Sequence, residues 1–525
     1  MGLMYKIADQ TWEFESIHKL NYKTFVEEIP QHEQTEECKR IDLFHEENTY
    51  LICLDGQRLV GMVAVRGKRP FSLDNKVPHL DEWLPERGDR VYEIRLLAVE
   101  REYRNGRALI GLIRFLHRYL LLNGYDLALI SATTRELPLY KQMGFCPLYK
   151  LVGTEQAAFQ PMYVTPKIFE QSSIASLVTK EYTFLPGPVE IAENVQQAFA
   201  SNPISHRSNQ FKATMGNVKK RLLQMTKAKH VQIMLGTGTL ANDSIALQLK
   251  LLKGRGLILT NGEFGNRLIK QANRVNVSFD TYEREIGKPF LYNEIEELMK
   301  QQGYEWVWFV HHETSTGMLN DLEELIRVSK QYGIKLCVDC ISSIGAISFS
   351  LEEVYFASGV SGKAIGAYTG LSFVFYNHIV QGNETLPTYM DIGMYEESGS
   401  VPYSQSWNLI YALQEALKKF EDEAEYEKIY QTYAFIEEAV MNMGLQLVSP
   451  KKYASSIILT IALDKELSSK EIGDSLALQG FIIHYESTYL QQNNWIQIAC
   501  LHHYKEREMK RMLDCLRMQI EQVHV

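Results

Sequence analysis

Lys363 is the residue whose surroundings most strongly suggest chemistry. It lies in the segment ASGVSGKAIGAYTGLSF (residues 357–373), with four glycines within seven positions and no other charged residue between Glu353 and Glu384. An ammonium group among small and apolar residues is either paired with an opposite charge or used in a reaction. The segment therefore marks Lys363 as a candidate covalent catalyst.

Four other segments carry groups that would suit one cofactor together with Lys363. They are the apolar run IKLCVD, which ends in Asp339, the glycine turn and helix GTGTLANDSIALQL (236–249), and the segments TNGEFGNR (260–267) and HHETSTGML (311–319). Pyridoxal phosphate needs a lysine to hold it and a carboxylate beside its ring nitrogen. It also needs N–H donors for its phosphate, which a helix start provides, and it benefits from a flat ring to stack on. The sequence thus predicts a pyridoxal-phosphate site.

A second candidate site lies in the first third of the chain. The segment EIRLLAVEREYRNGRALIGLIRFL (93–116) predicts a strand, a short basic turn with a glycine, and a helix, and LYKQMGFCPL (139–148) follows the next strand. Main-chain N–H groups at such a turn can bind a pyrophosphate. We therefore expect a phosphate-bearing ligand at this turn.

The elements that must position these residues form two α/β patterns. In the first 165 residues, strand-like runs at 49–65, 91–99 and 125–132 accompany an amphipathic helix at 107–124. After residue 184, short apolar runs alternate with helical stretches, which predicts βαβ units and a mainly parallel sheet. The candidate residues follow the ends of these runs, where open α/β sheets bind ligands.

The later part of the chain, residues 181–525, resembles the class V aminotransferases of the fold type I pyridoxal-phosphate enzymes. The alanine–glyoxylate, serine–pyruvate and aminoethylphosphonate–pyruvate aminotransferases are the most similar branch. The resemblance is carried by FLPGPVEI (184–191), SHRSNQF (205–211), GTGTLA (236–241), NGEFGNR (261–267), HHETSTG (311–317), VDCISSIGA (338–346) and SGVSGKAIGAYTGLSFV (358–374).

This resemblance implies roles around the cofactor ring. Lys363 would be the Schiff-base lysine and would shuttle the substrate's proton, and Asp339 would pair with the ring nitrogen. Phe264 would stack on the ring, and Ser315 would lie near the ring hydroxyl.

The resemblance also implies a phosphate site. The family is homodimeric, and Ser404 stands where a hydroxyl reaches the phosphate of the other subunit. The family usually has glutamine or histidine directly before the lysine, whereas this chain has Gly362, for which Ser361 would compensate. The remaining phosphate ligands would be Thr237, Gly238 and Thr239.

Gln497 marks the main departure from the family. Family members have an arginine in a late strand that binds the substrate's α-carboxylate, and the matching strand here, WIQIACL, has Gln497. A neutral amide cannot replace the charged, bidentate guanidinium. Three explanations stay open: the substrate lacks an α-carboxylate, another arginine such as Arg207 or Arg267 replaces the missing one, or the domain no longer transaminates.

The N-terminal part resembles the GNAT acyltransferases. The segments LNYKTFVEEIPQH (20–32) and EIRLLAV (93–99) are similar to the autoinducer synthases and N-acyl amino acid synthases, which take acyl groups from acyl carrier protein. The resemblance implies that the turn binds the pyrophosphate of an acyl-CoA and that Tyr140 protonates the leaving thiolate. Tyr103 stands where a basic residue is expected, and a core role for Tyr140 is the alternative. The turn residues are Arg104, Gly106, Arg107 and Ala108.

Fold class and domain boundaries follow from these patterns. We predict an α/β protein with a GNAT-like domain at 1–165, a linker at 166–182, a mainly parallel pyridoxal-phosphate-binding domain at 183–400 and a small α+β domain at 401–525. The linker prediction rests on a polar stretch with a serine cluster.

Composition narrows the partners. The net charge of −9 gives no support for a nucleic-acid or acidic-membrane partner, and no apolar run has spanning length. Seven scattered cysteines indicate a reducing, cytoplasmic setting, and the Cys337–Cys340 pair is better explained as core than as a metal site, so we predict no metal.

The leading hypothesis is a bifunctional enzyme that transaminates with pyridoxal phosphate and transfers an acyl group from acyl-CoA or acyl carrier protein to an amine. Its substrates would be small amines and carbonyl compounds. The alternatives are a pyridoxal-phosphate lyase or decarboxylase with a regulatory GNAT-derived domain, and a ligand sensor without turnover.

Overall fold

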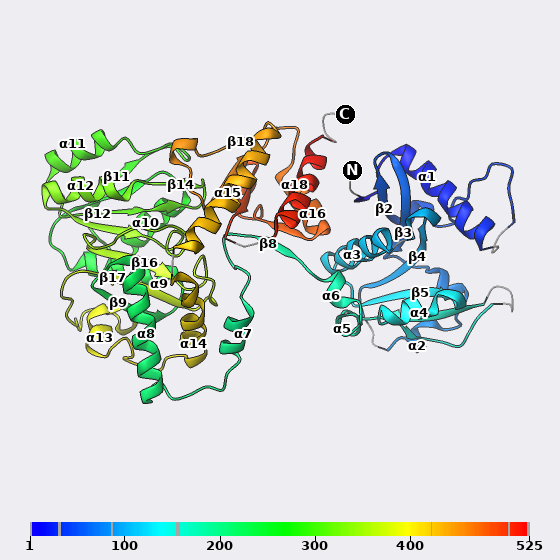
Figure 1. Ribbon diagram of the computed structural model, residues 1–525, viewed down its shortest axis with the longest axis horizontal. Helices are drawn as coiled ribbons and strands as arrows, with labels where there is room; N and C mark the ends of the chain where they lie inside the picture. Colours follow the sequence, from blue (N-terminus) through cyan, green and yellow to red (C-terminus); the bar gives the residue numbers. More distant parts are fainter. Residues whose placement is uncertain are drawn as a thin grey trace. The chain divides into compact units, whose positions relative to one another are not determined.

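The computed structural model describes residues 3–29, 33–85, 88–104, 106–153, 158–421, 423–501 and 504–521. The chain forms two compact units (Figure 1). The first comprises Met1–Tyr182 with Asp474–Phe481, and the second comprises Thr183–Gly473 with Ile482–Val525.

A seven-stranded sheet organises the described part of the first unit, in the order β1-β2-β3-β4-β5-β7-β6. β4 and β5 are parallel, and the other neighbours are antiparallel. The strands are β1 (Met4–Ile7), β2 (Thr49–Asp55), β3 (Arg58–Arg66), β4 (Val91–Val99), β5 (Leu127–Thr133), β6 (Cys146–Pro147) and β7 (Phe159–Val164). The helices and turns are α1 (Thr11–Tyr22), η1 (Lys23–Glu28), η2 (His45–Glu47), η3 (Ser72–Asn75), α2 (Leu80–Trp83), η4 (Arg101–Tyr103), α3 (Arg107–Leu122), η5 (Thr134–Glu136), α4 (Leu137–Gln142), α5 (Pro166–Glu170) and α6 (Ala175–Val178).

Alternation along the strands places a helix on each face of this sheet. Leu51 and Cys53 of β2 pack in the cluster that contains α3, whereas Ile52 and Leu54 pack in the cluster that contains α1. Because successive strand side chains point to opposite faces, one apolar strand serves both helices. The hairpin at 49–65 and the helix after the basic turn are therefore present as predicted.

Residues 166–182, predicted as a linker, instead contribute to the packed first unit. They contain α5 and α6, and Phe169 and Val178 are buried with the side chains of α3. Thr165 caps α5 by accepting a hydrogen bond from the Ile168 N–H. The serine-rich composition hid two short helices whose few apolar residues are spaced to reach the same core.

The second unit contains a mixed seven-stranded sheet among its described residues, in the order β11-β10-β12-β15-β16-β17-β9, with only β17 antiparallel to its neighbours. Its strands are β9 (His230–Leu235), β10 (Gly256–Thr260), β11 (Phe279–Glu283), β12 (Trp306–Val310), β15 (Lys335–Asp339), β16 (Phe356–Val360) and β17 (Leu371–Tyr376). The remaining strands are β8 (Tyr182–Phe184), β13 (His312–Glu313), β14 (Met318–Leu319), β18 (Gln446–Leu447), β19 (Ile458–Ala462), β20 (Phe481–Ile483) and β21 (Trp495–Ala499).

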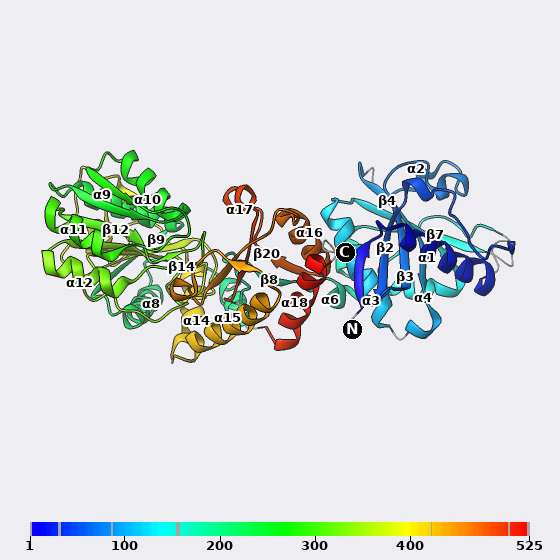
Figure 2. The same ribbon diagram turned by 90° about the horizontal axis from the view of Figure 1, so that it is seen from above.

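Helices cover both faces of this sheet (Figure 2). Val307 and Phe309 of β12 pack with α8, α12 and α14, whereas Trp306 and Trp308 pack with α9 and α10. The bounds are α7 (Glu193–Phe199), α8 (Asn209–Thr226), α9 (Gly238–Lys250), α10 (Glu263–Arg274), α11 (Tyr292–Gln302), α12 (Leu322–Tyr332), η6 (Thr388–Met390), α13 (Ile392–Glu397), α14 (Trp407–Ala416), η7 (Leu417–Phe420), α15 (Ala424–Asn442), η8 (Lys451–Tyr453), α16 (Ser469–Gln479), α17 (Thr488–Asn493) and α18 (Glu506–Glu521).

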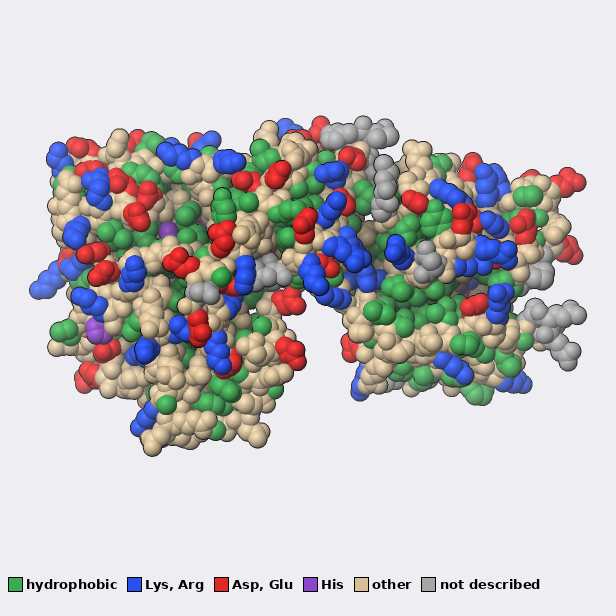
Figure 3. Space-filling model, viewed as in Figure 1, with side chains coloured by type: hydrophobic (Ala, Val, Ile, Leu, Met, Phe, Trp, Pro, Cys, Tyr) green, Lys and Arg blue, Asp and Glu red, His purple; other side chains and the backbone are tan. Residues whose placement is uncertain are grey.

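A small sheet near the C-terminus matters for the site. β19 lies between β18 and β21, and its Thr460 is the register partner of Gln497 in β21. On the visible face of the second unit, acidic and basic side chains are interspersed (Figure 3). Among the described residues, no helix has the length and apolar composition of a membrane span.

Candidate active site

The predicted cofactor residues of the second unit lie at one edge of its large sheet. β12, β15 and β16 are parallel, and their register pairs Val310 with Asp339 and Asp339 with Ser358. The carboxyl ends of these strands therefore lie side by side, and each leads into a candidate segment. Asp339 lies between the strand that leads to Ser315 and the strand that leads to Lys363.

Lys363 is half-buried, and its Nζ donates a hydrogen bond to Ser342 Oγ at 2.6 Å. Its Nζ also lies 5.6 Å from the centre of the Phe264 ring. Burial lowers the pKa of Lys363 to about 8, with a contribution from Arg267, although Asp339 and Glu313 act in the opposite direction. Lys363 can therefore lose its proton near neutral pH, as a nucleophilic amine must.

Asp339 is a buried carboxylate, 6% exposed, that accepts hydrogen bonds from Asn242 Nδ2 at 2.7 Å and from the Ile341 N–H at 2.9 Å. Burial raises its pKa. Within the described residues it forms no ion pair with a cation. A carboxylate held in this way is suited to a cation that arrives with a ligand, because the pairing would offset the cost of burial.

The start of α9 provides open backbone donors. Thr237 precedes the helix without capping it through its side chain, and both Thr237 and Thr239 are exposed. Gly238 is in close contact with Ile341, because a Cβ on the glycine would lie 2.4 Å from the Ile341 Cδ1. The uncapped helix start and its hydroxyls are a suitable site for a phosphate.

Glu313 is a site residue that the sequence reasoning missed. Its carboxylate is fully buried and accepts hydrogen bonds from the N–H groups of Phe264 at 3.1 Å, Gly265 at 3.0 Å and Ser315 at 3.2 Å. The Ser315 hydroxyl donates to the same carboxylate and accepts from the Glu263 N–H at 3.1 Å. Glu313 therefore fixes the start of α10, and with it Phe264, relative to Ser315. Its signal in the sequence was an acidic residue three positions beyond the end of the apolar run WVWFV (306–310).

The loop around Lys363 accounts for Gly362 and Ser361. A Cβ on Gly362 would lie 2.9 Å from the Thr369 Cα, so the loop leaves no room for a side chain there. The Ser361 hydroxyl is buried and donates to the Tyr368 carbonyl oxygen at 2.7 Å. Ser361 therefore uses its hydroxyl to close the loop that carries Lys363.

The other predicted residues of this unit occupy different settings. Ser404 lies exposed in the segment before α14, and Arg207 is exposed in the segment before α8. Among the described contacts neither side chain meets the groups around Lys363. Gln497 is fully buried, and its amide contacts the main chain of Thr314 and Ser315.

The first unit has a cavity where β4 and β5 separate. β4 pairs with β5 from Val91 to Ile94. Just beyond Ile94, the register between β3 and β4 shifts, and Leu96 has a φ of 52°. The cavity has a volume of about 100 Å³, and Tyr140 is among its lining residues. Most of the lining is apolar and comes from β4, α3, β5, α4 and η1. Such a lining suits an acyl chain more than a charged group.

The basic turn before α3 is held by protein partners. Arg104 pairs with Glu28 at 2.8 Å and donates through Nε to the Val99 carbonyl oxygen at 2.8 Å. The Tyr103 hydroxyl donates to Asp55 at 2.7 Å. Of the other turn residues, Gly106 has a φ of 91°, Arg107 is exposed and Ala108 is buried, and residue 105 lies outside the described residues.

Tyr140 faces the cavity, and burial raises its pKa to about 12. A phenol with this pKa keeps its proton at neutral pH. It can therefore donate a proton to a stronger base that forms beside it. Its ring packs edge-on against Phe145, with the two ring centres 5.9 Å apart.

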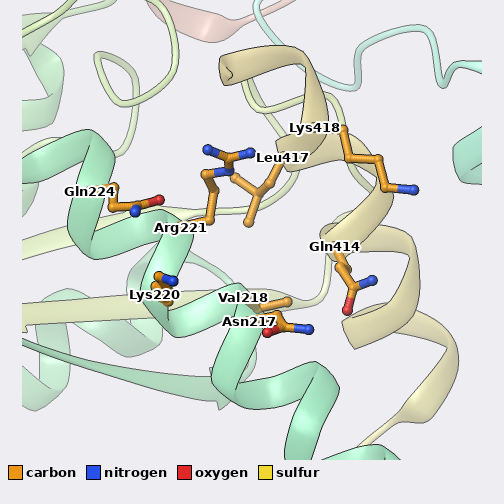
Figure 4. A pocket seen from close by; sticks show the side chains of 8 residues that line it. All are labelled: Asn217, Val218, Lys220, Arg221, Gln224, Gln414, Leu417 and Lys418. Carbon is orange, nitrogen blue, oxygen red and sulfur yellow. The ribbon is translucent and has the colours of Figure 1, made fainter. Parts of the chain in front are cut away.

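A separate polar cavity of about 330 Å³ lies between α8 and the α14–η7 segment (Figure 4). Arg221 from α8 lines it and pairs with Glu421 at 2.7 Å. None of the predicted cofactor residues contributes to it. The described residues contain no cluster of side chains that could hold a metal ion.

Comparison with known proteins agrees with this geometry. Residues 189–408 match the family model "Aminotransferase class-V", and residues 20–114 match "Acetyltransferase (GNAT) domain". The chain carries a class V aminotransferase domain. It also carries an N-terminal GNAT domain, and the mixed α/β fold is that of fold type I pyridoxal-phosphate aminotransferases with a GNAT domain in front.

This chain matches almost the full length of several relatives and solved structures. A 2-aminoethylphosphonate–pyruvate transaminase of Pseudomonas fluorescens strain Pf-5 is 25% identical over 65% of this chain and 96% of its own. A second from Pseudomonas aeruginosa strain UCBPP-PA14 is 26% identical over the same shares. The ureidoglycine–glyoxylate aminotransferase of Bacillus subtilis aligns with a TM-score of 0.60 at 19% identity, over 66% of this chain and 94% of its own. An alanine–glyoxylate aminotransferase of Nostoc sp. aligns with a TM-score of 0.59 at 23% identity, over 65% and 95%.

The aminotransferase domain fits pyridoxal phosphate at three separate points. Lys363 has a lowered pKa beside the Phe264 ring, Asp339 is a buried carboxylate that forms no ion pair among the described residues, and the start of α9 has no side-chain cap. Burial of Lys363 and Asp339 costs free energy, and the N–H groups at the start of α9 lack a side-chain cap. A ligand with an aldehyde for Lys363, a basic ring nitrogen for Asp339 and a phosphate for the helix start would bind all three.

Proposed function

We propose that this protein is a bifunctional enzyme that transaminates a small amine with a carbonyl compound and transfers an acyl group to an amine. The observation that carries the first activity is the presence of Lys363 and Asp339 at one sheet edge, each with its pKa shifted by burial against the charged form. The relatives named as 2-aminoethylphosphonate–pyruvate transaminases support an amine and a carbonyl compound as the substrate types.

In the aminotransferase domain, pyridoxal phosphate would supply an electron sink that stabilises negative charge on the substrate carbon. Lys363 would hold the cofactor and carry the proton that leaves this carbon, for which a pKa of about 8 is suited. Ser342 would orient the amine, since it accepts the Nζ hydrogen bond. Asp339 would hold the ring nitrogen, and the start of α9 would hold the phosphate.

In the GNAT domain, the acyl donor would be an acyl-CoA or an acyl carrier protein. The acceptor amine forms the C–N bond while the C–S bond of the thioester breaks; the amine nitrogen releases one proton and the leaving thiolate takes up one. Tyr140 supports this step because it lines the cavity and keeps its proton at neutral pH, so its hydroxyl can donate a hydrogen bond to the sulfur as negative charge develops on it. The apolar lining would contact the acyl chain.

We further propose that the enzyme is a homodimer in which Ser404 reaches the cofactor phosphate of the other subunit. Its exposure is compatible with that role. Sedimentation would measure the state of the full chain. A monomeric holoenzyme would contradict the proposal, whereas a dimer whose Ser404→Ala variant loses cofactor more readily would support it.

The two activities can be tested separately in the same protein. The purified holoenzyme would be supplied with amines, keto acids and a series of acyl-CoAs, with carbonyl product and free thiol measured in parallel. We expect Lys363→Ala to abolish formation of the carbonyl product and to leave thiol release unchanged. We expect Tyr140→Phe to lower thiol release strongly and to leave formation of the carbonyl product unchanged. Absence of both signals over the full panel would contradict the proposal.

A further inference from the structure

Gln497 lies in the interior of the small sheet, next to the aminotransferase site. Its neighbours across the strands are Thr460 in β19 and His484, with which it exchanges two main-chain hydrogen bonds of 3.0 and 2.8 Å. The side chain is 0% exposed. Its position is therefore set by backbone pairing on both sides.

Protein groups occupy both ends of the Gln497 amide. Nε2 donates to the carbonyl oxygens of Thr314 at 2.6 Å and Ser315 at 3.2 Å and to Thr460 Oγ1 at 2.8 Å. Because carbonyl oxygens only accept, the amide nitrogen must face them and Oε1 must face the other way. Oε1 then accepts from His484 Nδ1 at 2.8 Å and from the Tyr489 hydroxyl at 3.3 Å.

This orientation places a proton on His484 Nδ1, and because the pKa of His484 is lowered from its ordinary value, the ring is neutral at neutral pH. Its Nε2, 2.6 Å from Ser487 Oγ, is then the acceptor of the serine hydroxyl. Burial is the main cause that lowers the pKa of His484, and Lys363 adds to it. His484 therefore contributes no positive charge to the site.

The Gln497–His484 pair is connected to Lys363 through a chain of hydrogen bonds. Thr314, whose carbonyl binds Gln497, donates from Oγ1 to Ser342 Oγ at 2.7 Å, and Ser342 is the hydrogen-bond partner of Lys363. Only Thr314 and Ser342 therefore separate the Gln497 amide from the Lys363 amine. A substituent on the substrate's reacting carbon would approach this wall of neutral groups.

Among the described residues, the charged groups that act on Lys363 include one cation, and it already pairs with Glu263 through its Nε. They are Asp339, Glu313 and Arg267. Arg267 is half-exposed, pairs with Glu263 at 3.3 Å, and lies 4.6 Å from the Phe264 ring centre. A buried carboxylate or phosphonate needs a cation or free donors, and both ends of the Gln497 amide are already occupied.

We propose that the aminotransferase domain takes as its amino donor a primary amine whose substituent is uncharged, and that Gln497 is a positioning residue that maintains this neutral wall. The proposal rests on the proposed transamination. It places the specificity of the site in the Gln497–His484–Tyr489 group, and it distinguishes this chain's donor from an aminophosphonate or an α-amino acid.

The test is the donor half-reaction of the holoenzyme, followed as loss of the visible absorbance of the bound cofactor. Four donors of similar size serve as probes: 1-aminopropane, 3-aminopropanoate, alanine and 2-aminoethylphosphonate. We expect 1-aminopropane to react at least about tenfold faster than each anionic donor. Faster reaction of an anionic donor would overturn this proposal and leave transamination standing. A stable yellow enzyme that converts none of them would overturn both.

Substitutions at Gln497 test the positioning role. Gln497→Arg presents donors to His484 and Tyr489 and adds a cation, so we expect the rate ratio to shift by about tenfold toward the anionic donors. Gln497→Glu keeps an acceptor for His484 but adds a buried negative charge. It should move the pH profile of cofactor attachment to Lys363 toward higher pH, which a purely structural residue would not do.

A conservative change provides the control. Tyr489→Phe removes only the 3.3 Å hydrogen bond to Oε1 and leaves the charge unchanged, so the donor ratio should change by less than about threefold. Circular dichroism would establish that each variant is folded. Unchanged donor ratios and pH profiles in folded Gln497→Arg and Gln497→Glu would overturn the proposal.

Discussion

The two candidate sites of this protein differ in how their charges are balanced. In the aminotransferase domain, the half-buried Lys363 and the buried Asp339 have pKa values that burial shifts against their charged forms. In the GNAT domain, Arg104 is already paired with Glu28, and Tyr103 with Asp55. From this difference we infer that a cofactor would complete the first site, whereas a ligand that binds Arg104 or Tyr103 at the second would displace protein contacts.

The largest expected effect comes from removing the amine of the first site. Lys363→Ala should lower transamination by about 10⁴-fold or more, because covalent attachment and proton transfer are lost together. The purified variant should also lack the visible absorbance of the attached cofactor. If the variant kept wild-type absorbance and turnover, the comparison would fail, because the uncompensated lysine would then have no role.

The carboxylate of the same site should have the next largest effect. Asp339→Asn keeps the shape and the contact to Asn242 but cannot pair with a protonated ring nitrogen. We expect transamination to fall on the order of 10²-fold, as when one electrostatic partner of a reacting centre is removed. Steady-state kinetics would measure the loss, with Asn242→Ala as a partner variant that keeps the charge. An equal loss in both variants would mean that Asp339 acts through its hydrogen bonds.

Tyr140→Phe tests the corresponding group of the second site. The ring and its contact with Phe145 stay in place, and only the hydroxyl is removed. Thiol release should fall by about 10²-fold, the range for loss of a general acid, while transamination is unchanged. Full acyl transfer by the variant would show that Tyr140 is a core residue and that the leaving thiolate takes its proton from elsewhere.

The pH dependence of cofactor attachment would sharpen the description of Lys363. Its pKa is lowered to about 8, and only the neutral amine attacks the cofactor aldehyde. Attachment to cofactor-free protein should therefore rise with pH through a midpoint near 8 and be about tenfold below its plateau at pH 7. Stopped-flow absorbance would follow it. A midpoint near the ordinary value of 10.5 would mean that burial does not act on this lysine.

The same contrast explains which parts of the site the sequence predicted. Lys363, Asp339 and the start of α9 are specified locally, because a lone lysine, an acid ending a strand and a glycine turn are visible in short segments. Glu313 was missed because its function depends on hydrogen bonds to the start of α10. Its partner Phe264 lies 49 residues earlier in the chain. Long-range hydrogen bonds of this kind leave almost no pattern in one sequence.

Gln497 and residues 166–182 show the same limit. The sequence identified Gln497 as a departure from the family. It did not show that both ends of the Gln497 amide are hydrogen-bonded, because the partners are Thr314, 183 residues away, and His484. The polar segment 166–182 was interpreted as a linker because its composition is that of a loop, whereas Phe169 and Val178 pack on α3. Composition describes the exposed majority of a short helix, and tertiary packing depends on the few residues that it buries.

The smallest expected effect concerns the ion pair that occupies the GNAT turn. Glu28→Ala would free Arg104, whose guanidinium is now shared between Glu28 and the Val99 carbonyl. Since partly exposed ion pairs contribute about 0.2–1 kcal/mol, binding of coenzyme A should tighten by only about 1.4- to fivefold. Calorimetry at low salt would measure it, with Glu102→Ala as a control that removes the exposed pair with Arg58 near the same turn. Weaker binding in Glu28→Ala would mean that this pair orders the turn for its ligand, and the contrast between the two sites would then disappear.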